Sequence, residues 1–183
     1  MALSHPDSAP DWFWPSWAAE ARLPQFHLRD TKSSHGRYAQ DIKVITGKDL
    51  VKFHGHACDG LFRAMLALEQ GLAALFPDRM IDRTDLRVRS HNSPCLGDVA
   101  AYLTGGRIRF NTQDVEHRSG VWFVLQRIST EQAVEVHELP GVYPPELAAE
   151  EARLLRAAAA SPEEIDRLRE AQWDWVRYRL LAQ

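Results

Sequence analysis

A long amphipathic stretch in the middle of the chain constrains the fold more than any other feature. Its apolar side chains recur at spacings of four, three, four and three residues and therefore share one helical face: Leu61, Met65, Leu68, Leu72 and Leu75. The pattern predicts a helix from about Asp59 to Phe76, which Pro77 ends. We expect this helix to be the central, buried element of the fold.

Two shorter helices carry clear start signals. Thr46 and Asp49 have the spacing of a capping box, which predicts a helix that begins at Gly47. Ser93 and Pro94 match an N-cap serine followed by a proline at the first helical position, so a second helix is predicted over 94–103. Both helices begin or end close to histidine and cysteine residues.

The strand signals cluster after residue 84. Alternating or continuous apolar runs predict strands over 85–91, 107–111, 121–128 and 133–137. An alanine-rich helix is expected up to about residue 159, and a last one begins at the capping residue Ser161. This order predicts an α+β fold: a small, antiparallel-rich sheet, a central buried helix and flanking C-terminal helices.

The chain length of 183 residues suits one domain with a real hydrophobic core. We divide it into an aromatic arm with a polar loop (1–40), an α+β core (41–140) and a C-terminal helical extension of the same domain (141–183). Because the core needs no metal for its stability, a metal bound here would serve function rather than folding.

Composition excludes several classes of function. The net charge of -3, from 22 basic and 25 acidic residues, gives no broad basic face, so we expect no nucleic-acid partner. No apolar run approaches the length of a membrane span, and no secretory leader is recognised, which predicts a cytoplasmic protein. Two cysteines do not form a disulfide framework, so they are free for chemistry, metal binding or packing.

His54, His56 and Cys58 form the first candidate site. They lie within five residues at a predicted helix-to-helix turn, where Gly55 allows the backbone to fold sharply. Neutral imidazole and thiolate are preferred ligands of zinc, and a helix that starts at Cys58 would lower the pKa of its thiol. The other interpretation is a pair of packed histidines that cap helices.

Cys95 is the second candidate. It falls in the first turn of the helix predicted after Ser93, where a thiolate is stabilised, and Asp98 lies one turn further along. The alternative for Cys95 is a buried small hydrophobe. Both cysteines of the chain stand at predicted helix N-termini, which favours a reactive or ligating role. His91, at the end of a strand, could join the site or simply terminate the strand.

Two separated blocks resemble the formylmethanofuran dehydrogenase FmdE family. Residues 53–61 are similar to its motif F-H-G-H-x-C-P-G-L, and residues 95–105 are similar to its segment C-x-x-D-A-x-x-x-x-T-G. The resemblance covers about residues 47–137. Asp59 replaces the usual proline, Gly106 stands where many members carry another cysteine, and the zinc ribbon of some members is absent.

The resemblance and the residues together point to one site built from both blocks. A divalent metal, with zinc favoured, would be bound by His54, His56, Cys58 and Cys95. Asp98 would form a hydrogen bond to one of these ligands or act as a general base. The leading hypothesis is a metal- or thiolate-dependent enzyme acting on a small molecule. The alternatives are a zinc-binding accessory subunit or metal carrier for a larger redox complex, and a metal-free thiol enzyme with Cys95 as the nucleophile.

The N-terminal arm carries Trp12, Phe13, Trp14 and Trp17. So much apolar surface is normally covered, either by the chain's own domain or by another protein. The resemblance to a family whose members look dimeric, and the frequency of two-fold dimers, predict a homodimer in which the arm of one subunit covers the other.

Overall fold

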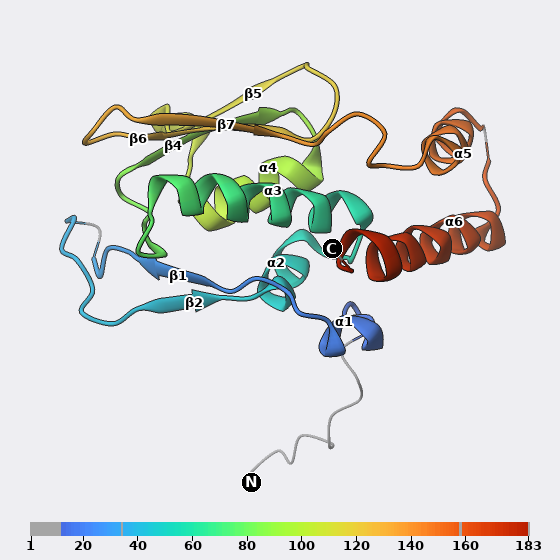
Figure 1. The fold of residues 1–183 in the computed structure, drawn as a ribbon, viewed down its shortest axis with the longest axis horizontal. Helices are drawn as coiled ribbons and strands as arrows, with labels where there is room; N and C mark the ends of the chain where they lie inside the picture. Colours follow the sequence, from blue (N-terminus) through green and yellow to red (C-terminus); the bar gives the residue numbers. More distant parts are fainter. Residues whose placement is uncertain (1–11, 34, 158, 183) are drawn as a thin grey trace, which may run out of the picture.

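The computed structural model describes residues 12–33, 35–157 and 159–182. Two small sheets enclose a layer of helices, as Figure 1 shows, with the larger sheet above and the smaller one below the helices in that view. The helical layer contains α3 (Asp59–Leu75) and α4 (Pro94–Thr104). The predicted α+β class and the central buried helix are confirmed.

Capping interactions set the starts of the helices near the two candidate blocks. In α2 (Gly47–His54), the Thr46 hydroxyl accepts from the Asp49 N–H, and the Asp49 carboxylate accepts from the Thr46 N–H. In α4, the Ser93 side chain accepts from Leu96 N–H, and proline occupies the first turn. Both predicted helix starts are confirmed.

The larger sheet has the strand order β5-β4-β6-β7. The central strands β4 (Leu86–His91) and β6 (Trp122–Arg127) are antiparallel, and β7 (Ala133–His137) pairs antiparallel with β6. The edge strand β5 (Gln113–Glu116) runs parallel to β4. The predicted strands over 85–91, 121–128 and 133–137 are therefore present.

The predicted strand over 107–111 is wrong. Ile108–Phe110 form one turn of 3₁₀ helix, called η1, and Asn111 closes the turn with a φ of 55°. The Thr112 hydroxyl accepts from the Arg107 N–H and holds the two ends of the turn together. Alternating basic and apolar residues imitate a strand here, but the apolar side chains of Ile108 and Phe110 are exposed.

A second sheet lies before residue 84, where the sequence patterns predict no strand. Its order is β2-β1-β3, formed by β2 (Lys43–Ile45), β1 (Phe26–Arg29) and β3 (Met80–Asp82). Strands of three or four residues are too short to show a reliable alternating pattern. In addition, β1 pairs in parallel with β3, a partner far along the chain. Long-range pairing, not local pattern, creates this sheet.

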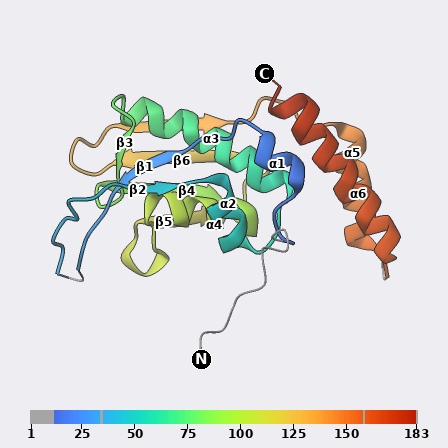
Figure 2. The ribbon, with the colours of Figure 1, turned by 90° about the horizontal axis from the view of Figure 1, so that it is seen from below.

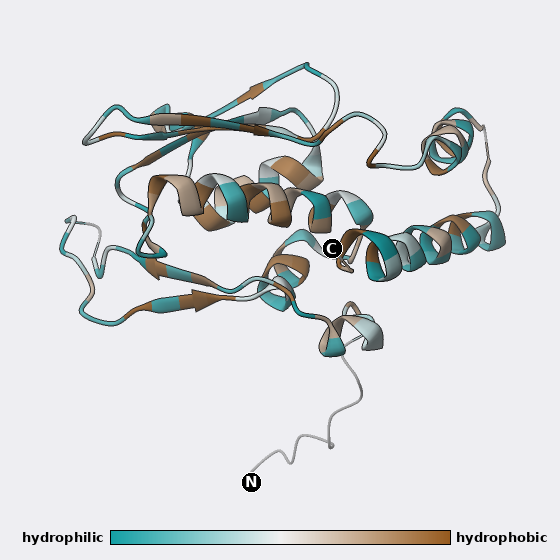
Figure 3. Cartoon of the chain, in the orientation of Figure 1, coloured by the Kyte–Doolittle hydropathy of each residue, from teal (hydrophilic) through white to brown (hydrophobic). Residues whose placement is uncertain are grey.

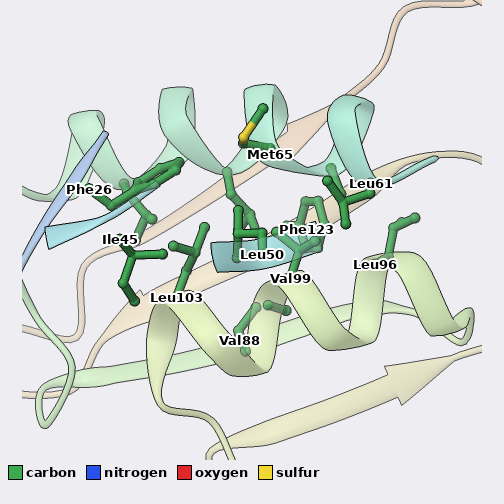
Figure 4. Packing of buried hydrophobic residues seen from close by; sticks show 14 of the residues in the cluster. Phe26, Ile45, Leu50, Leu61, Met65, Val88, Leu96, Val99, Leu103 and Phe123 are labelled. Carbon is green, nitrogen blue, oxygen red and sulfur yellow. The ribbon is translucent and has the colours of Figure 1, made fainter. Parts of the chain in front are cut away.

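The core lies between α3 and its neighbours. The apolar face predicted for α3 is almost completely buried, from Leu61 to Leu75. Figure 4 shows Leu61 of α3 in the same cluster as Leu50 of α2, Val99 of α4 and Phe123 of β6. Each fully buried side chain of this kind contributes about 1.5–3 kcal/mol. Figure 3 colours the chain by hydropathy and shows that hydrophilic residues predominate on the last long helix, outside this core.

The C-terminal helices α5 (Pro145–Arg156) and α6 (Pro162–Trp175) lie side by side at one end of the molecule (Figures 1 and 2). A π-helical turn, η2 (Val176–Leu180), continues α6, and Val176 is fully buried in the core. The Trp173 indole N–H donates to the Ala57 carbonyl at 2.9 Å. This bond ties α6 to the turn that carries the first candidate block.

The described part of the aromatic arm packs mainly on its own chain. Trp17, in the short helix α1 (Ser16–Glu20), lies 5.3 Å from Phe62 and 6.4 Å from Trp173 between ring centroids. Phe13 and Trp14 are partly buried against the core. Trp12 is different, because 87% of it is exposed. Residues 1–11 lie outside the described part. No described helix is long and apolar enough to cross a membrane.

Gly71, in the middle of α3, should tolerate no side chain. A Cβ built there would lie 2.6 Å from Leu125 Cδ1 and 3.3 Å from Val136 Cγ1. We expect Gly71→Ala to lower the free energy of unfolding by about 1–3 kcal/mol, because the overpacking outweighs the gain in helix propensity. Gly97→Ala in α4 is the matched control, since its nearest neighbour would be 4.0 Å away. Urea unfolding that shows Gly71→Ala to be as stable as Gly97→Ala would contradict this packing.

Candidate metal centre

The turn between α2 and α3 brings the first block together. Gly55 ends α2 in the left-handed region, with a φ of 103°, and its N–H donates to the Val51 carbonyl. His54 is thus the last residue of α2, while Cys58 is the N-cap of α3 and its sulfur accepts from the Leu61 N–H at 3.4 Å. A single sharp turn therefore holds two imidazoles and one thiol.

The packing of α4 against α3 brings in the second block. Cys95 Sγ lies 3.3 Å from Cys58 Sγ, although 37 positions separate the two residues. Two thiolates bound to one tetrahedral zinc ion would lie less than about 4.5 Å apart, and the observed separation is within this limit. Gly60 permits this approach, because a Cβ there would lie 3.2 Å from Cys95 Sγ. Both cysteines are free thiols.

Asp98 orients His54. The Asp98 Oδ2 atom lies 2.8 Å from His54 Nδ1, and the opposite ring nitrogen, Nε2, lies 3.7 Å from Cys58 Sγ. The His54 side chain is only 3% exposed. A carboxylate that accepts from Nδ1–H leaves Nε2 unprotonated and pointing at the thiols, which is the usual arrangement behind a metal-bound histidine.

His56 completes a group with ligand geometry. Its ring centroid lies 4.5 Å from that of His54, and the ligand atoms of His54, His56 and Cys58 all lie within 4.8 Å of one another. Loss of solvation around the ring lowers the pKa of His56, and repulsion from His54 adds to this effect. The neutral imidazole, which is the form that binds metal, is therefore favoured.

The two thiols share a hydrogen bond that separates their pKa values. The bond to Cys58 lowers the pKa of Cys95 to about 7, and His54 contributes to the same shift. The bond to Cys95 raises the pKa of Cys58, and burial raises it further. The expectation of a lowered pKa at Cys58 is thus wrong for the metal-free pair, because Cys58 acts as the proton donor and Asp59 adds a nearby negative charge.

The donor set fits a borderline-soft divalent cation. Two sulfurs and two imidazoles are a common zinc ligand set, in which sulfurs bound at ~2.3 Å in a tetrahedron lie ~3.8 Å apart. The observed 3.3 Å needs only a small adjustment. The metal-ligand group found among the described residues contains His54, His56 and Cys58 but neither Cys95 nor His91. Cys95 is adjacent to this group through its contact with Cys58, whereas the His91 Nδ1 is buried without a hydrogen-bond partner among the described residues.

A cavity of about 1060 Å³ opens beside the site, hereafter the site cavity. His56, Cys58 and Cys95 line it together with residues of α5 and α6. The polar and aromatic side chains that α5 and α6 contribute to this cavity were not among the candidate site residues predicted from the sequence. The concentration of tryptophan and tyrosine near residues 173–178 was the only local signal.

A buried ion-pair network borders the same cavity. Arg63 in α3 donates to Asp59 at 3.1 Å through Nη1 and to Glu138 at 2.8 Å through Nε. Its guanidinium also lies over the Tyr143 ring, 4.2 Å from the centroid. Asp59, by holding the Arg63 guanidinium, therefore helps to attach the segment after β7 to α3.

Comparisons with known proteins support one assignment. The family model described as "FmdE, Molybdenum formylmethanofuran dehydrogenase operon" matches residues 53–181. This match includes both candidate blocks and also extends through α5 and α6, past the end of the resemblance at residue 137. No curated protein matches the chain.

Proposed function

The chain belongs to the FmdE family, and from this premise we propose that it is a metal-dependent cytoplasmic enzyme acting on a small molecule. The site is a His/Cys group that could hold a metal ion. In our proposal His54, His56, Cys58 and Cys95 are the ligands and zinc is the metal. Such a metal polarises a substrate oxygen or activates water, provided that one coordination position is open to solvent or substrate.

Each residue has a defined task in this proposal. His54 is held in one tautomer by Asp98, at 2.8 Å. Cys58 is fixed by the Leu61 N–H and by Cys95. His56 is the exposed member of the group and therefore the ligand that can move aside when substrate enters. Asp98, with its carboxylate partly exposed, accepts from the Nδ1–H of His54 and so keeps the Nε2 lone pair available for the metal.

The observation that carries the proposal is the opening of the site into the site cavity. Structural zinc sites are closed by four protein ligands, whereas catalytic sites leave one position to water or substrate, which in this proposal is the position that His56 vacates. Here His56, Cys58 and Cys95 all line a cavity large enough for a small organic molecule. This placement favours catalysis over a purely structural metal.

A second candidate is an accessory or carrier protein that binds zinc for a larger complex. The exposed apolar side chains of the C-terminal helices favour it, because Leu155 is 81% exposed and Ile165 is 51% exposed. Together with Trp12, these residues offer a surface for another protein. We propose a second copy of the chain as that protein in a homodimer.

Cobalt substitution tests the open site. Protein purified without chelators should contain about one metal per chain by elemental analysis. After replacement by Co²⁺, cyanide or imidazole should change the visible absorption spectrum, because an open coordination position accepts an added ligand. Wild-type protein without metal would refute the metal site, and a cobalt spectrum insensitive to both ligands would favour the carrier.

A further inference from the structure

The site cavity has a distinctive distribution of charge. Two arginines and two carboxylates line it: Arg63, Arg169, Asp59 and Glu151. Arg63 is already bound by two carboxylates, those of Asp59 and Glu138. Arg169 is paired with Asp166 at 3.0 Å and lies over the Trp173 ring. Neither arginine therefore has an unmatched positive charge to offer to an anionic ligand.

Glu151 is the unmatched charge. This residue of α5 lines the cavity and forms no ion pair with any residue that the structure describes. Its hydrogen-bonding neighbour is the Tyr143 hydroxyl. Burial raises the pKa of Glu151, and the charge of Asp59 raises it further. The positive charge of Arg63 acts in the opposite direction but does not outweigh these two effects, so a cation bound beside Glu151 would stabilise its charged form.

A bound metal would not supply a charge partner for Glu151. A divalent ion with two thiolates and two neutral imidazoles has no net charge. Glu151 therefore stays without an ion-pair partner among the described residues when a metal is bound. The cavity around it is also lined by apolar and aromatic side chains, including Phe13, Val121, Leu155 and Trp173.

We propose that the site cavity binds a small organic cation, whose apolar body lies against the aromatic wall and whose positive group is held by Glu151. The ligand class would be a primary amine or a similar cation with an apolar or aromatic part. The statement that this molecule is the substrate of the metal site rests on the proposed function. The binding itself depends only on the cavity and Glu151.

Three probes of similar shape test the charge preference. Phenethylammonium, 2-phenylethanol and phenylacetate differ in the charge of one end, and their affinities can be measured by calorimetry on the full chain. We expect phenethylammonium to bind roughly tenfold or more tightly than 2-phenylethanol, because it forms a charged hydrogen bond with a partly buried carboxylate, and phenylacetate to bind most weakly. The measurement is repeated on Cys58→Ser/Cys95→Ser protein, so that direct ligation of a metal by the amine or carboxylate is removed.

Variants of α5 identify the residue responsible. Glu151→Gln should abolish the preference for the cation, and Glu151→Lys should transfer the preference to phenylacetate. Glu146→Gln, an exposed change in the first turn of the same helix, should have no effect. Circular dichroism verifies that each variant is folded, and the reversed preference of Glu151→Lys is a gain that unfolding could not produce.

The outcomes separate this inference from the proposed function. If the wild-type protein contains no metal but binds the cation in a way that depends on Glu151, the inference is supported and the metal-dependent enzyme is refuted. Suppose instead that the wild-type protein contains metal. A preference of the thiol-free variant for phenylacetate, no binding of any probe, or a cation preference that survives in Glu151→Gln would then overturn the inference and leave the metal site intact.

Discussion

Replacing Cys58 by serine is expected to leave the protein with almost no bound metal. The Cys58 sulfur lies at the centre of the site, 3.3 Å from Cys95 Sγ and 3.7 Å from His54 Nε2. A serine hydroxyl is a poor substitute for a thiolate ligand, and first-sphere zinc ligands contribute strongly to binding. Elemental analysis of proteins purified in parallel without chelators should show about one metal per wild-type chain and a small fraction of that in Cys58→Ser.

Graded variants make this prediction more specific. His56→Ala should also lose most of the metal, whereas Asp98→Asn should weaken binding about 10–100-fold, because it removes only the partner that orients His54. His27→Ala, an exposed histidine in β1, serves as the control and should retain full metal content. If Asp98→Asn and His27→Ala had the same metal affinity in a competition assay with a chelator, Asp98 would not contribute to metal binding by orienting His54.

Removing the Arg63 side chain should cause the largest loss of stability among the polar variants. Arg63→Met keeps the apolar stem of the side chain but leaves Asp59 and Glu138 as buried carboxylates without their cation. The three side chains are 14%, 9% and 15% exposed, respectively. Breaking a buried ion pair in this way costs about 3–5 kcal/mol, which is a large part of the stability of a typical domain. Urea unfolding of the wild-type and Arg63→Met proteins measures this loss as the difference between their free energies of unfolding.

Arg89→Met is the matched control for Arg63→Met. Arg89 also contacts two carboxylates, those of Asp114 and Glu116, but all three side chains are about half exposed or more accessible. Solvent screens such pairs, and their loss should cost less than about 1 kcal/mol. Adding Asp59→Asn and Glu138→Gln to Arg63→Met should recover part of the stability. Equal losses in Arg63→Met and Arg89→Met would show that the network is not buried in solution.

Local sequence signals were sufficient for the helices near the site. The side-chain oxygens of Thr46 and Ser93 cap nearby N–H groups, and these interactions span only three residues. The apolar face of α3 was equally clear, because a periodic pattern over 17 residues averages out local exceptions. The short strands before residue 84 lacked such a pattern, and the turn at Ile108–Phe110 imitated one.

The candidate ligands could be named from the sequence because two blocks of histidine and cysteine stood at predicted helix ends. Their meeting depended on tertiary structure. Cys58 and Cys95 touch because α3 and α4 pack closely at Gly60, and Asp98 reaches His54 across 44 positions of the chain. No local propensity encodes a distance between two helices.

The sequence by itself determined which residues can bind metal and at which helix ends they stand, since capping and periodicity act over a few neighbouring residues. Only the tertiary structure decided what surrounds them. The site cavity, the pairing of Arg63 with Glu138 and the unmatched Glu151 arise where the C-terminal helices lie against the core. Their physical basis is burial and electrostatic interaction between segments far apart in the chain, which become defined only when the chain is folded.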